Sequence, residues 1–329
     1  MKKNRLFRIA IILTLFLFLP AHPGTGEGNL PPSPEPPPAF MTGRPTPAPT
    51  AEPAETVIDH IHNPGQYPNF SFKNNRKLLE IWFPNIRDAD AAVLMYDGQV
   101  WMIDCGDERA AARTVILLRQ LGIKKIDVIF NTHLHHDHIN GLAMTNEEAA
   151  VGELRICFAP DLTESGLRML QTTSELNIPV KEYKDGDRFV MGDGAVELLF
   201  LKNSEEYLDF NNQSAQTRIT YGYRSILFTA DMEMPGQEAM FSRIGPELLR
   251  CDIVKYPHHA KSDMYQPFYE AMDAKLAVVT SYVGRRDAGQ AALARRGLPV
   301  AFTAVNGKFL HLATDGEYWL CEQVDITAR

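Results

Sequence analysis

The chain has 329 residues, enough for one large domain or two small ones. Its formal net charge is −8, and 45% of its residues are hydrophobic, which is ordinary for a globular protein. The negative charge excludes a global basic field that would draw the chain to nucleic acid or to an anionic membrane. An anionic substrate would therefore need a local basic patch or bound metal ions.

Residues 1–26 are predicted to be a signal peptide, with an uncleaved signal anchor as the alternative. Basic residues at Lys2, Lys3, Arg5 and Arg8 precede an apolar run, Ile9 to Leu19, that is short for a membrane span. We therefore expect an exported protein, extracellular or at the cell surface. Any membrane attachment would be limited to this N-terminal anchor, because no later stretch is long and apolar enough to cross a bilayer.

Residues 27–72 are predicted to form a disordered stalk. Runs such as PPSPEPPPAF and RPTPAPTAEPAE contain too few apolar residues to form a core, and their prolines favour an extended chain. Beyond this stalk, residues 73–329 have the composition and hydrophobic pattern of a globular domain.

The first half of that domain alternates strands and helices. Periodicity and turn residues predict strands at 78–83, 92–96, 99–103, 126–130, 154–158 and 180–183, and helices at 110–121 and 166–176. In the first helix, Val115, Leu118 and Leu121 are expected to face the core.

The second half repeats this pattern. It predicts a hairpin near 192–194, strands at 216–221, 225–230, 253–256 and 276–280, a helix at 237–244 and another before Lys275. Two strand-rich halves with interspersed helices predict an α/β fold of two sheets packed face to face and flanked by helices. The four cysteines, Cys105, Cys157, Cys251 and Cys321, are widely spaced; free thiols are favoured, with disulfides left open.

The main chemical signal is the segment NTHLHHDHINGL, which directly follows a predicted buried strand. His133 and His135 are two residues apart and could share one metal ion, while Asp137 and His138 would point to a neighbouring one. Imidazole and carboxylate ligands suit Zn²⁺ or another borderline divalent ion.

This HxHxDH pattern resembles the metallo-β-lactamase superfamily, which implies an αββα sandwich of two mixed sheets and a centre of two divalent ions, Zn²⁺ or alternatively Mn²⁺. The resemblance implies that Asp104 hydrogen-bonds the metal ligands without binding metal itself, and that Asp231 bridges both metals. Of the pair in PHHAKSD, His258 is expected to ligate the second metal. His259 is expected to be a catalytic neighbour that either binds metal directly or contacts phosphate, and the sequence leaves open which histidine of the pair is the ligand.

Within the superfamily the chain resembles the metallo-hydrolase domain of the ComEC-type competence proteins. Asn211 and Ser214 match its Asn-x-x-Ser element and would support the site from outside the metal ligands. TAD and PHHAKS resemble its TGD and PHHGS motifs, with alanine in place of each glycine. No histidine lies between His138 and His258, which departs from the β-lactamases proper.

These features predict an exported phosphodiesterase that uses a metal-bridged hydroxide on nucleic acid or on a cell-envelope phosphodiester. Asp137 would orient the nucleophile, and Lys261 would bind a phosphate oxygen of a small-molecule or polymeric substrate. The alternatives are a carbonyl hydrolase, such as a lactonase or β-lactamase, and a non-catalytic, metal-stabilised surface protein. The oligomeric state is left open.

Overall fold

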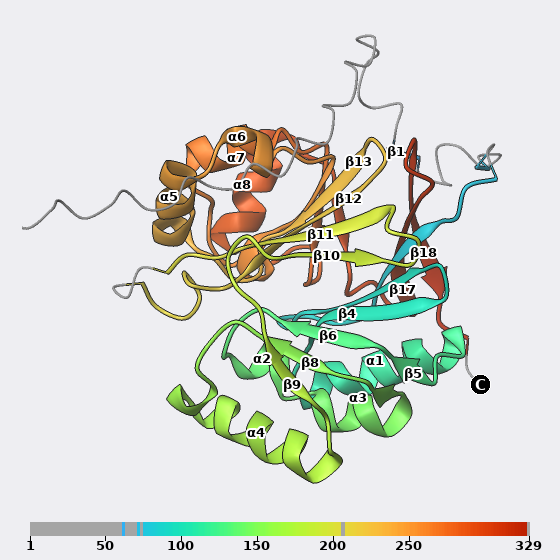
Figure 1. Cartoon of the computed structure of the whole chain (residues 1–329). Helices are drawn as coiled ribbons and strands as arrows, with labels where there is room; N and C mark the ends of the chain where they lie inside the picture. The colour runs from blue at the N-terminus through green and yellow to red at the C-terminus, as the bar shows by residue number, and fades with distance from the viewer. Residues whose placement is uncertain (1–60, 63–70, 73–74, 205–207, 328–329) are drawn as a thin grey trace, which may run out of the picture. The chain divides into compact units, whose positions relative to one another are not determined.

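A computed structural model describes residues 61–62, 71–72, 75–204 and 208–327 (Figure 1). These residues belong to one compact unit that begins at Ala51. The predicted signal segment lies outside the described residues, as does nearly all of the predicted stalk. Among the helices that are described, none is both long and apolar enough to cross a membrane.

The first sheet has nine strands and is mixed. Parallel pairs lie at its two margins, and an antiparallel block that includes β2 and β3 lies between them. The spatial order is β1 (Ile61–His62), β18 (Trp319–Asp325), β17 (Lys308–Thr314), β2 (Leu79–Phe83), β3 (Ala91–Tyr96), β4 (Gln99–Cys105), β6 (Val128–Asn131), β8 (Leu154–Ile156) and β9 (Val180–Glu182). A separate short pair joins β5 (Lys125–Ile126) to β7 (Ala150–Val151).

The second sheet has seven strands, antiparallel at its start and parallel from β13 onward. Its order is β10 (Arg188–Met191), β11 (Val196–Leu201), β12 (Gln216–Tyr221), β13 (Arg224–Phe228), β14 (Ile253–Lys255), β15 (Leu276–Val279) and β16 (Val300–Phe302). The two mixed sheets and their flanking helices confirm the predicted α/β sandwich.

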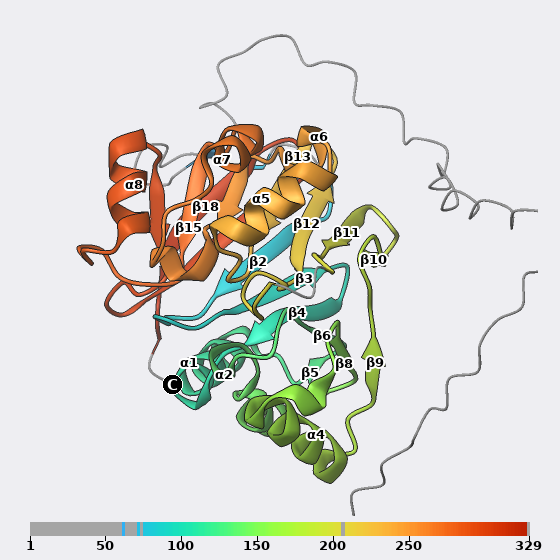
Figure 2. The same ribbon diagram turned by 90° about the vertical axis from the view of Figure 1, so that its left-hand side faces the viewer.

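Helices cover the outer face of each sheet, as the two views in Figures 1 and 2 show. Those on the nine-stranded side are α1 (Glu108–Leu121), α2 (His136–Ile139), α3 (Leu142–Glu148) and α4 (Glu164–Leu176). Those on the seven-stranded side are α5 (Met234–Arg243), α6 (Pro246–Leu249), α7 (Gln266–Met272) and α8 (Ala288–Arg296). Single 3-10 turns lie at Pro160–Leu162 and Pro257–Ala260.

Three apolar clusters fill the interfaces between these four layers. The central cluster lies between the sheets and is rich in aromatic residues, including Phe83, Phe130 and Phe200. The outer clusters pack each sheet against its helices, through residues such as Leu117 on one side and Phe268 on the other. Burial of alternate strand faces and of one helix face therefore accounts for the layered arrangement.

The face of α1 that contacts the sheet differs in part from the one expected. Leu118 is buried as predicted and half-buried Leu121 packs against the same apolar cluster, but Val115 is not part of that cluster and Leu117 is buried as well. The helix turns its small residues, Ala110 and Ala111 among them, toward the sheet, which rotates the buried face away from Val115. Its ends match sequence signals: the Asp107 side chain accepts a hydrogen bond from the Ala110 amide, and Gly122 ends the helix with φ +71°.

Several other boundaries differ from the sequence prediction. The strand predicted at 126–130 is divided between β5 and β6, and helices α3 and α8 were not predicted. Ile61–His62 falls within the predicted stalk but forms β1, which pairs in parallel with β18. Two residues of backbone pairing need little apolar surface, so the composition that predicts the stalk does not reveal this strand.

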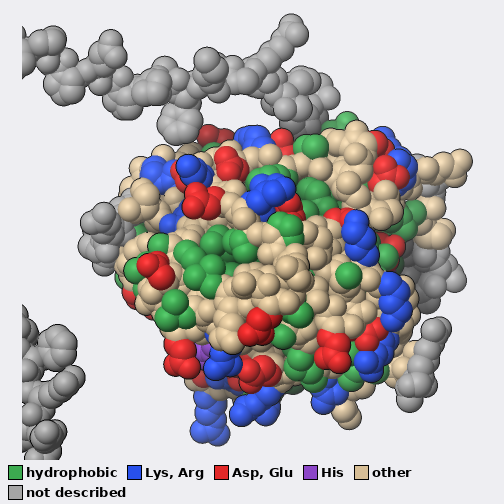
Figure 3. Space-filling model, turned by 60° about the horizontal axis from the view of Figure 1, so that its bottom comes forward, with side chains coloured by type: hydrophobic (Ala, Val, Ile, Leu, Met, Phe, Trp, Pro, Cys, Tyr) green, Lys and Arg blue, Asp and Glu red, His purple; other side chains and the backbone are tan. Residues whose placement is uncertain are grey.

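The surface mixes charges of both signs. On the face shown in Figure 3, acidic and basic side chains are interspersed around a hydrophobic area. This view agrees with the modest net charge of −8, which provides no strong single-sign field.

The central cluster generates a stability prediction. The buried Phe130 ring packs within 6 Å, centroid to centroid, of the rings of Trp101, Tyr183, Phe189 and Phe200. Phe130→Ala should lower the free energy of unfolding by about 3–5 kcal/mol, because it removes apolar contact and leaves a cavity. Leu162→Ala, at a side chain that is 60% exposed, should change it by less than about 0.5 kcal/mol. Denaturant titration of both variants tests this, and equal losses would contradict the assigned core.

Candidate metal centre

The polar residues of the site lie at one edge of both sheets. Strands β4 and β6 are parallel neighbours in the first sheet, and β13, β14 and β15 are parallel neighbours in the second. Since the carboxyl ends of parallel strands meet at the same edge, the segments that follow them are brought together. These segments carry Asp104, the histidine motif, Asp231 and the His258–His259 pair.

Asp104 is a buried hub at the end of β4. One carboxylate oxygen accepts hydrogen bonds from the Asn131 side chain and the Thr132 amide, both at 2.8 Å. The other accepts from the Thr132 hydroxyl at 2.8 Å and faces His138 Nδ1 at 2.7 Å. Because every partner acts as a donor, the group is an acceptor-only carboxylate and His138 carries a proton on Nδ1.

Four side chains meet beside this hub. One potential ligand atom from each of Asp137, His138, Asp231 and His259 lies within 4.8 Å of all the others. His138 Nε2 is 3.3 Å from Asp231 Oδ1, and His259 Nε2 is 3.3 Å from Asp137 Oδ2 and 3.6 Å from Asp231 Oδ2. Within the described residues, neither His138 Nε2 nor Asp231 Oδ1 has a hydrogen-bond partner, although both are buried.

His133 and His135 form a pair next to this group. His133 Nε2 faces His135 Nδ1 at 3.1 Å, and the His133 and His138 rings are 4.1 Å apart, centroid to centroid. The Thr132 hydroxyl donates to Asp104, so its oxygen accepts from His133 Nδ1 at 3.1 Å. His133 Nε2 therefore carries a lone pair, which faces His135 Nδ1 in this structure and could ligate a metal ion instead.

This donor set fits divalent metal ions. Two atoms held about 2.0–2.1 Å from one tetrahedral Zn²⁺ lie roughly 3.3 Å apart, which matches the separations just described. Hydrogen bonds at Nδ1 leave Nε2 of His133 and of His138 available for metal. In metal sites, the ligand rings are typically oriented in this way by hydrogen-bond partners that do not bind the metal themselves.

Electrostatics within the cluster favour a bound cation. Burial lowers the pKa of His138, but the carboxylates of Asp231 and Asp104 outweigh this and raise it well above the ordinary value. Burial raises the pKa of Asp231, but His259 and His138 hold it well below its usual range. Burial lowers the pKa of His133 well below its ordinary value, so this ring is neutral and able to ligate. A metal ion would replace the proton on His138 Nε2.

The structure places His259, not His258, in the buried group. His259 is fully buried, which favours the metal-ligand alternative for this residue over contact with a substrate phosphate. His258 is half-buried, its Nδ1 lies 2.7 Å from Glu233 Oε1, and its Nε2 is 3.8 Å from Asp231 Oδ2. Adjacent residues in a tight turn point in different directions, which the sequence spacing could not resolve.

Two turns at the site have left-handed backbone without glycine. Ala230, directly before Asp231, has φ +45°, and His258, His259 and Ala260 have φ +49°, +53° and +62°. Alanine at positions 230 and 260 therefore adopts a backbone that glycine would adopt freely, at a steric cost. Strain of this kind persists where surrounding contacts hold it, as it commonly does at functional sites.

Asn211, Ser214 and Lys261 occupy the surroundings. The Asn211 side chain lies beside His135 and favours its charged form, although burial lowers the pKa of that ring overall. Ser214 is buried, and the next residue, Ala215, donates its amide to the Thr132 carbonyl at 3.0 Å. Lys261 is half-buried, and its side chain forms no ion pair within the described residues.

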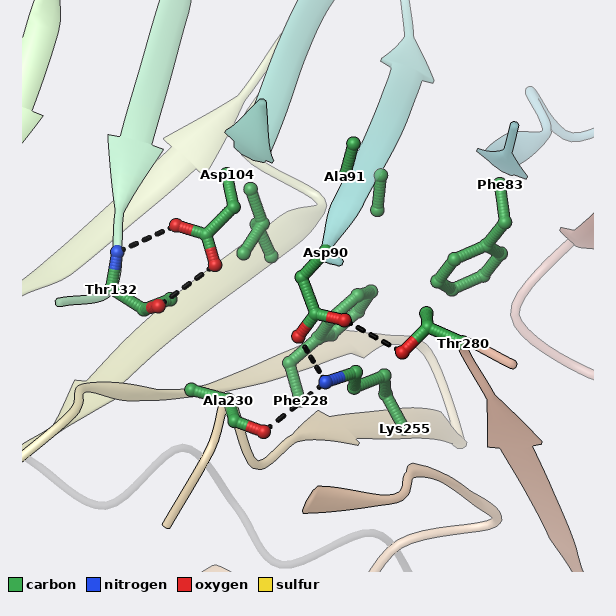
Figure 4. A pocket seen from close by; sticks show the side chains of 11 residues that line it. Phe83, Asp90, Ala91, Asp104, Thr132, Phe228, Ala230, Lys255 and Thr280 are labelled. Atoms are coloured by element: carbon green, nitrogen blue, oxygen red, sulfur yellow. Dashed lines mark hydrogen bonds and ion pairs between the residues drawn. The ribbon is translucent and has the colours of Figure 1, made fainter. Parts of the chain in front are cut away.

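Sequence reasoning missed four polar residues of the site: Asp90, Glu233, Lys255 and Thr280. Asp90, Lys255 and Thr280 line a small cavity between the sheets that also includes Asp104 and Thr132 (Figure 4). Lys255 had a visible signal, since it is a charged residue within the apolar strand that precedes PHH. Glu233 follows Asp231 by two residues, but nothing in the local pattern indicates its pairing with His258.

The four cysteines are free thiols, as favoured. Cys105 lies directly beneath α2, where its thiol contacts the carbonyl of Ile139 at 3.4 Å. Burial raises the pKa of Cys157 to about 11 and that of Cys251 to about 12, so both thiols stay protonated.

Comparison with known proteins shows sequence similarity to proteins named ribonuclease Z and zinc phosphodiesterase. Ribonuclease Z of Oceanobacillus iheyensis is 33% identical over 135 residues, covering 38% of this chain and 39% of that protein. Human zinc phosphodiesterase ELAC protein 1 is 43% identical over 56 residues, covering 17% of this chain and 15% of that protein. The matched regions thus span less than half the length of either relative.

Similarity in structure and in family pattern covers more of the chain. The metallo-beta-lactamase fold protein YhfI from Bacillus subtilis is 15% identical, with a TM-score of 0.47, covering 68% of this chain and 96% of that one. The family model of the metallo-beta-lactamase superfamily matches residues 87–272, more than half of the sequence. The chain therefore belongs to the metallo-beta-lactamase superfamily.

Proposed function

We propose that the chain is a metal-dependent phosphodiesterase with nucleic acid as its substrate class. The observation that carries this proposal is the buried convergence of Asp137, His138, Asp231 and His259 beside the His133–His135 pair. Relatives named ribonuclease Z and zinc phosphodiesterase support a phosphodiester bond as the target. The ComEC-type resemblance supports the same bond and rests on sequence motifs alone. Export stays a prediction from residues 1–26, which the structure does not describe.

The proposed ligands form two sets joined by one carboxylate. His133 and His135 would hold one ion, Asp137, His138 and His259 would hold the other, and Asp231 would contribute to both. His259 thus replaces His258 in the set expected from sequence. Bound divalent ions would lower the pKa of coordinated water and offset the negative charge that develops on the phosphate. Asp137 is the most exposed carboxylate of the group at 8%, so it is the one placed to orient an attacking water.

His258 and Glu233 form a pair suited to proton donation. Because Glu233 can accept a hydrogen bond from Nδ1 at 2.7 Å, a second proton on the ring would be carried on Nε2. The ring is half-buried and therefore accessible from solvent, unlike His259. As the bond to phosphorus breaks, Nε2 would pass this proton to the leaving oxygen, and Glu233 would hold the ring in place.

Lys261 is the proposed counter-charge for a non-bridging phosphate oxygen. It directly follows the left-handed turn that carries His259, and its ammonium is not committed to another group within the described residues. Arg285, by contrast, is already paired with Asp88 and Asp287. Because acidic and basic side chains are mixed on the surface in Figure 3, the metal ions would supply most of the attraction for an anion.

The alternatives are less well supported. A carbonyl hydrolase of the β-lactamase type is disfavoured because Asn211 and Ser214 stand in the region where those enzymes carry a histidine. A non-catalytic surface protein is disfavoured because the donor set is intact and the histidine–glutamate pair would have no role.

The first prediction concerns metal content. The purified chain should bind close to two divalent ions, and His133→Ala should lose at least one, because its Nε2 lone pair is removed. His136→Ala is the matched control: this histidine lies in the same motif, but its side chain is 67% exposed. Elemental analysis and Zn²⁺ titration measure both. Active wild-type protein without metal would refute the proposal.

The second prediction concerns the substrate. Zn²⁺- or Mn²⁺-loaded protein should cleave bis-p-nitrophenyl phosphate and single-stranded RNA or DNA, and Asp231→Asn should abolish this. Lys261→Ala should mainly raise KM, because a peripheral phosphate contact contributes uniform binding. Lys275→Ala, whose ammonium pairs with Asp273, is the control for loss of a lysine. Phosphorylcholine esters and nitrocefin complete the panel. Cleavage of the choline esters alone would favour a cell-envelope substrate, and turnover of nitrocefin alone would show that the carbonyl alternative is right.

The third prediction separates proton donation from metal binding at His258. His258→Gln should keep its metal but lose roughly 100-fold or more in kcat on a dinucleotide, whose alkoxide must be protonated to leave. The loss on bis-p-nitrophenyl phosphate should be much smaller, because p-nitrophenolate leaves without a proton. Glu233→Gln should show the same contrast, more weakly. Loss of a metal ion from His258→Gln would instead make His258 a ligand, as the sequence first suggested.

A further inference from the structure

A buried ion pair lies behind the metal ligands, between the two sheets. Lys255 ends β14 and is 1% exposed, and its ammonium contacts the carboxylate of Asp90, at the start of β3 (Figure 4). Phe83 and Phe228 also line this cavity, so the pair sits among aromatic side chains. Burying a charged pair in such surroundings costs free energy, because both charges lose their hydration. Well-packed apolar residues at these positions would make the folded state at least as stable. Its presence therefore calls for a role other than stability.

Asp90 connects the ion pair to His259 through hydrogen bonds. Asp90 beside an ammonium is an acceptor, so the Thr280 hydroxyl donates to Asp90 Oδ1, at 2.7 Å. The Thr280 oxygen then accepts from His259 Nδ1, at 2.8 Å, which is closer than the direct 3.3 Å approach of Nδ1 to Asp90 Oδ1. With Nδ1 as the donor, Nε2 is the ring atom left to face Asp137 Oδ2, at 3.3 Å. The chain of hydrogen bonds from Lys255 thus selects which nitrogen of His259 is presented to the centre.

Lys255 connects the ion pair to the backbone next to Asp231. The Lys255 ammonium also donates to the carbonyl of Ala230, at 3.1 Å. Ala230 has φ +45°, and the next residue is Asp231. The backbone of Lys255 holds the same turn, because its carbonyl accepts a hydrogen bond from the Thr229 hydroxyl at 2.6 Å. This strained turn aims Asp231 at His138 Nε2.

We propose that Lys255 is a positioning residue for the metal centre: through Asp90 and Thr280 it orients His259, and through Ala230 it orients Asp231. This inference rests on the proposed metal-binding role of those two side chains. It assigns Asp90 and Thr280 to the ion held by His259, and it assigns Lys255 to that ion and also, through Asp231, to the carboxylate that the two ions would share. A single buried cation would thus help to organise the centre before any metal binds.

Three variants of the full chain test this role. Thr280→Val removes the hydroxyl that links Asp90 to His259 and leaves the Lys255–Asp90 pair intact. Thr280→Ser restores the hydroxyl. Asp90→Leu combined with Lys255→Met removes both charges, so neither is left buried without a partner. The matched control is Thr303→Val, a buried threonine whose hydroxyl donates to the Ile86 carbonyl at 2.7 Å.

Co²⁺ titration of the metal-free proteins, followed by visible absorption, gives the number of sites and their Kd. Thr280→Val should weaken one of two sites by roughly 10- to 100-fold and change its absorption spectrum, with the other site unaffected, whereas the double variant should weaken both sites, because it also removes the Lys255 contact behind Asp231. Thr280→Ser and Thr303→Val should stay within about twofold of wild type. Thermal unfolding of the metal-free proteins should show Thr280→Val folded like wild type, which excludes a merely structural effect.

Two outcomes would overturn the proposal, and they differ in what else they refute. If Thr280→Val binds both ions as tightly as wild type, the positioning role is wrong and the proposed function is untouched. If the wild-type chain binds no divalent ion, the proposed function fails and the positioning role fails with it. Should the double variant not fold, Thr280→Val alone decides.

Discussion

Two buried carboxylates, Asp104 and Asp90, impose the constraint on which the site depends. Each accepts hydrogen bonds at its own strand end, and each acts on a histidine of the centre, Asp104 on His138 and Asp90 on His259 through Thr280. A carboxylate that only accepts forces the ring to donate from Nδ1, so Nε2 is left for the metal position. The packing of the two sheets and the strained turns at their strand ends bring these partners together.

The proposed function requires an acidic chain to bind an anionic substrate. The net charge is −8, and basic and acidic side chains are mixed on the visible surface (Figure 3). Positive charge would instead be concentrated in the metal ions and in Lys261 at the rim. The two adjacent histidines then divide the work: buried His259 faces the ligands, and half-buried His258 pairs with Glu233. Such a division suits phosphodiester cleavage, which needs both charge stabilisation and a proton for the leaving oxygen.

Much of the fold could be predicted from local pattern. Alternating strands and amphipathic helices indicated the two-sheet sandwich, and the order of HxHxDH, TAD and PHH indicated the superfamily. These signals are local: each depends on residues within a few positions of one another, such as the spacing of His133 to His138. Errors arose where local pattern is weak, as in the face of α1 and the two-residue strand at Ile61–His62.

The sequence by itself determined the residue types of the centre and the strand ends that carry them. Only the tertiary structure decided which side chains meet. His258 and His259 are equivalent in the sequence, and the left-handed turn that separates their directions is built without glycine, so no residue type marks it. Lys255 and Asp90 are 165 positions apart, and Asp90 and Thr280 are 190. Contacts at such separations depend on how the two sheets pack. Packing brings the start of β3 to the same edge as the carboxyl ends of β14 and β15, and spacing along the chain does not reveal this.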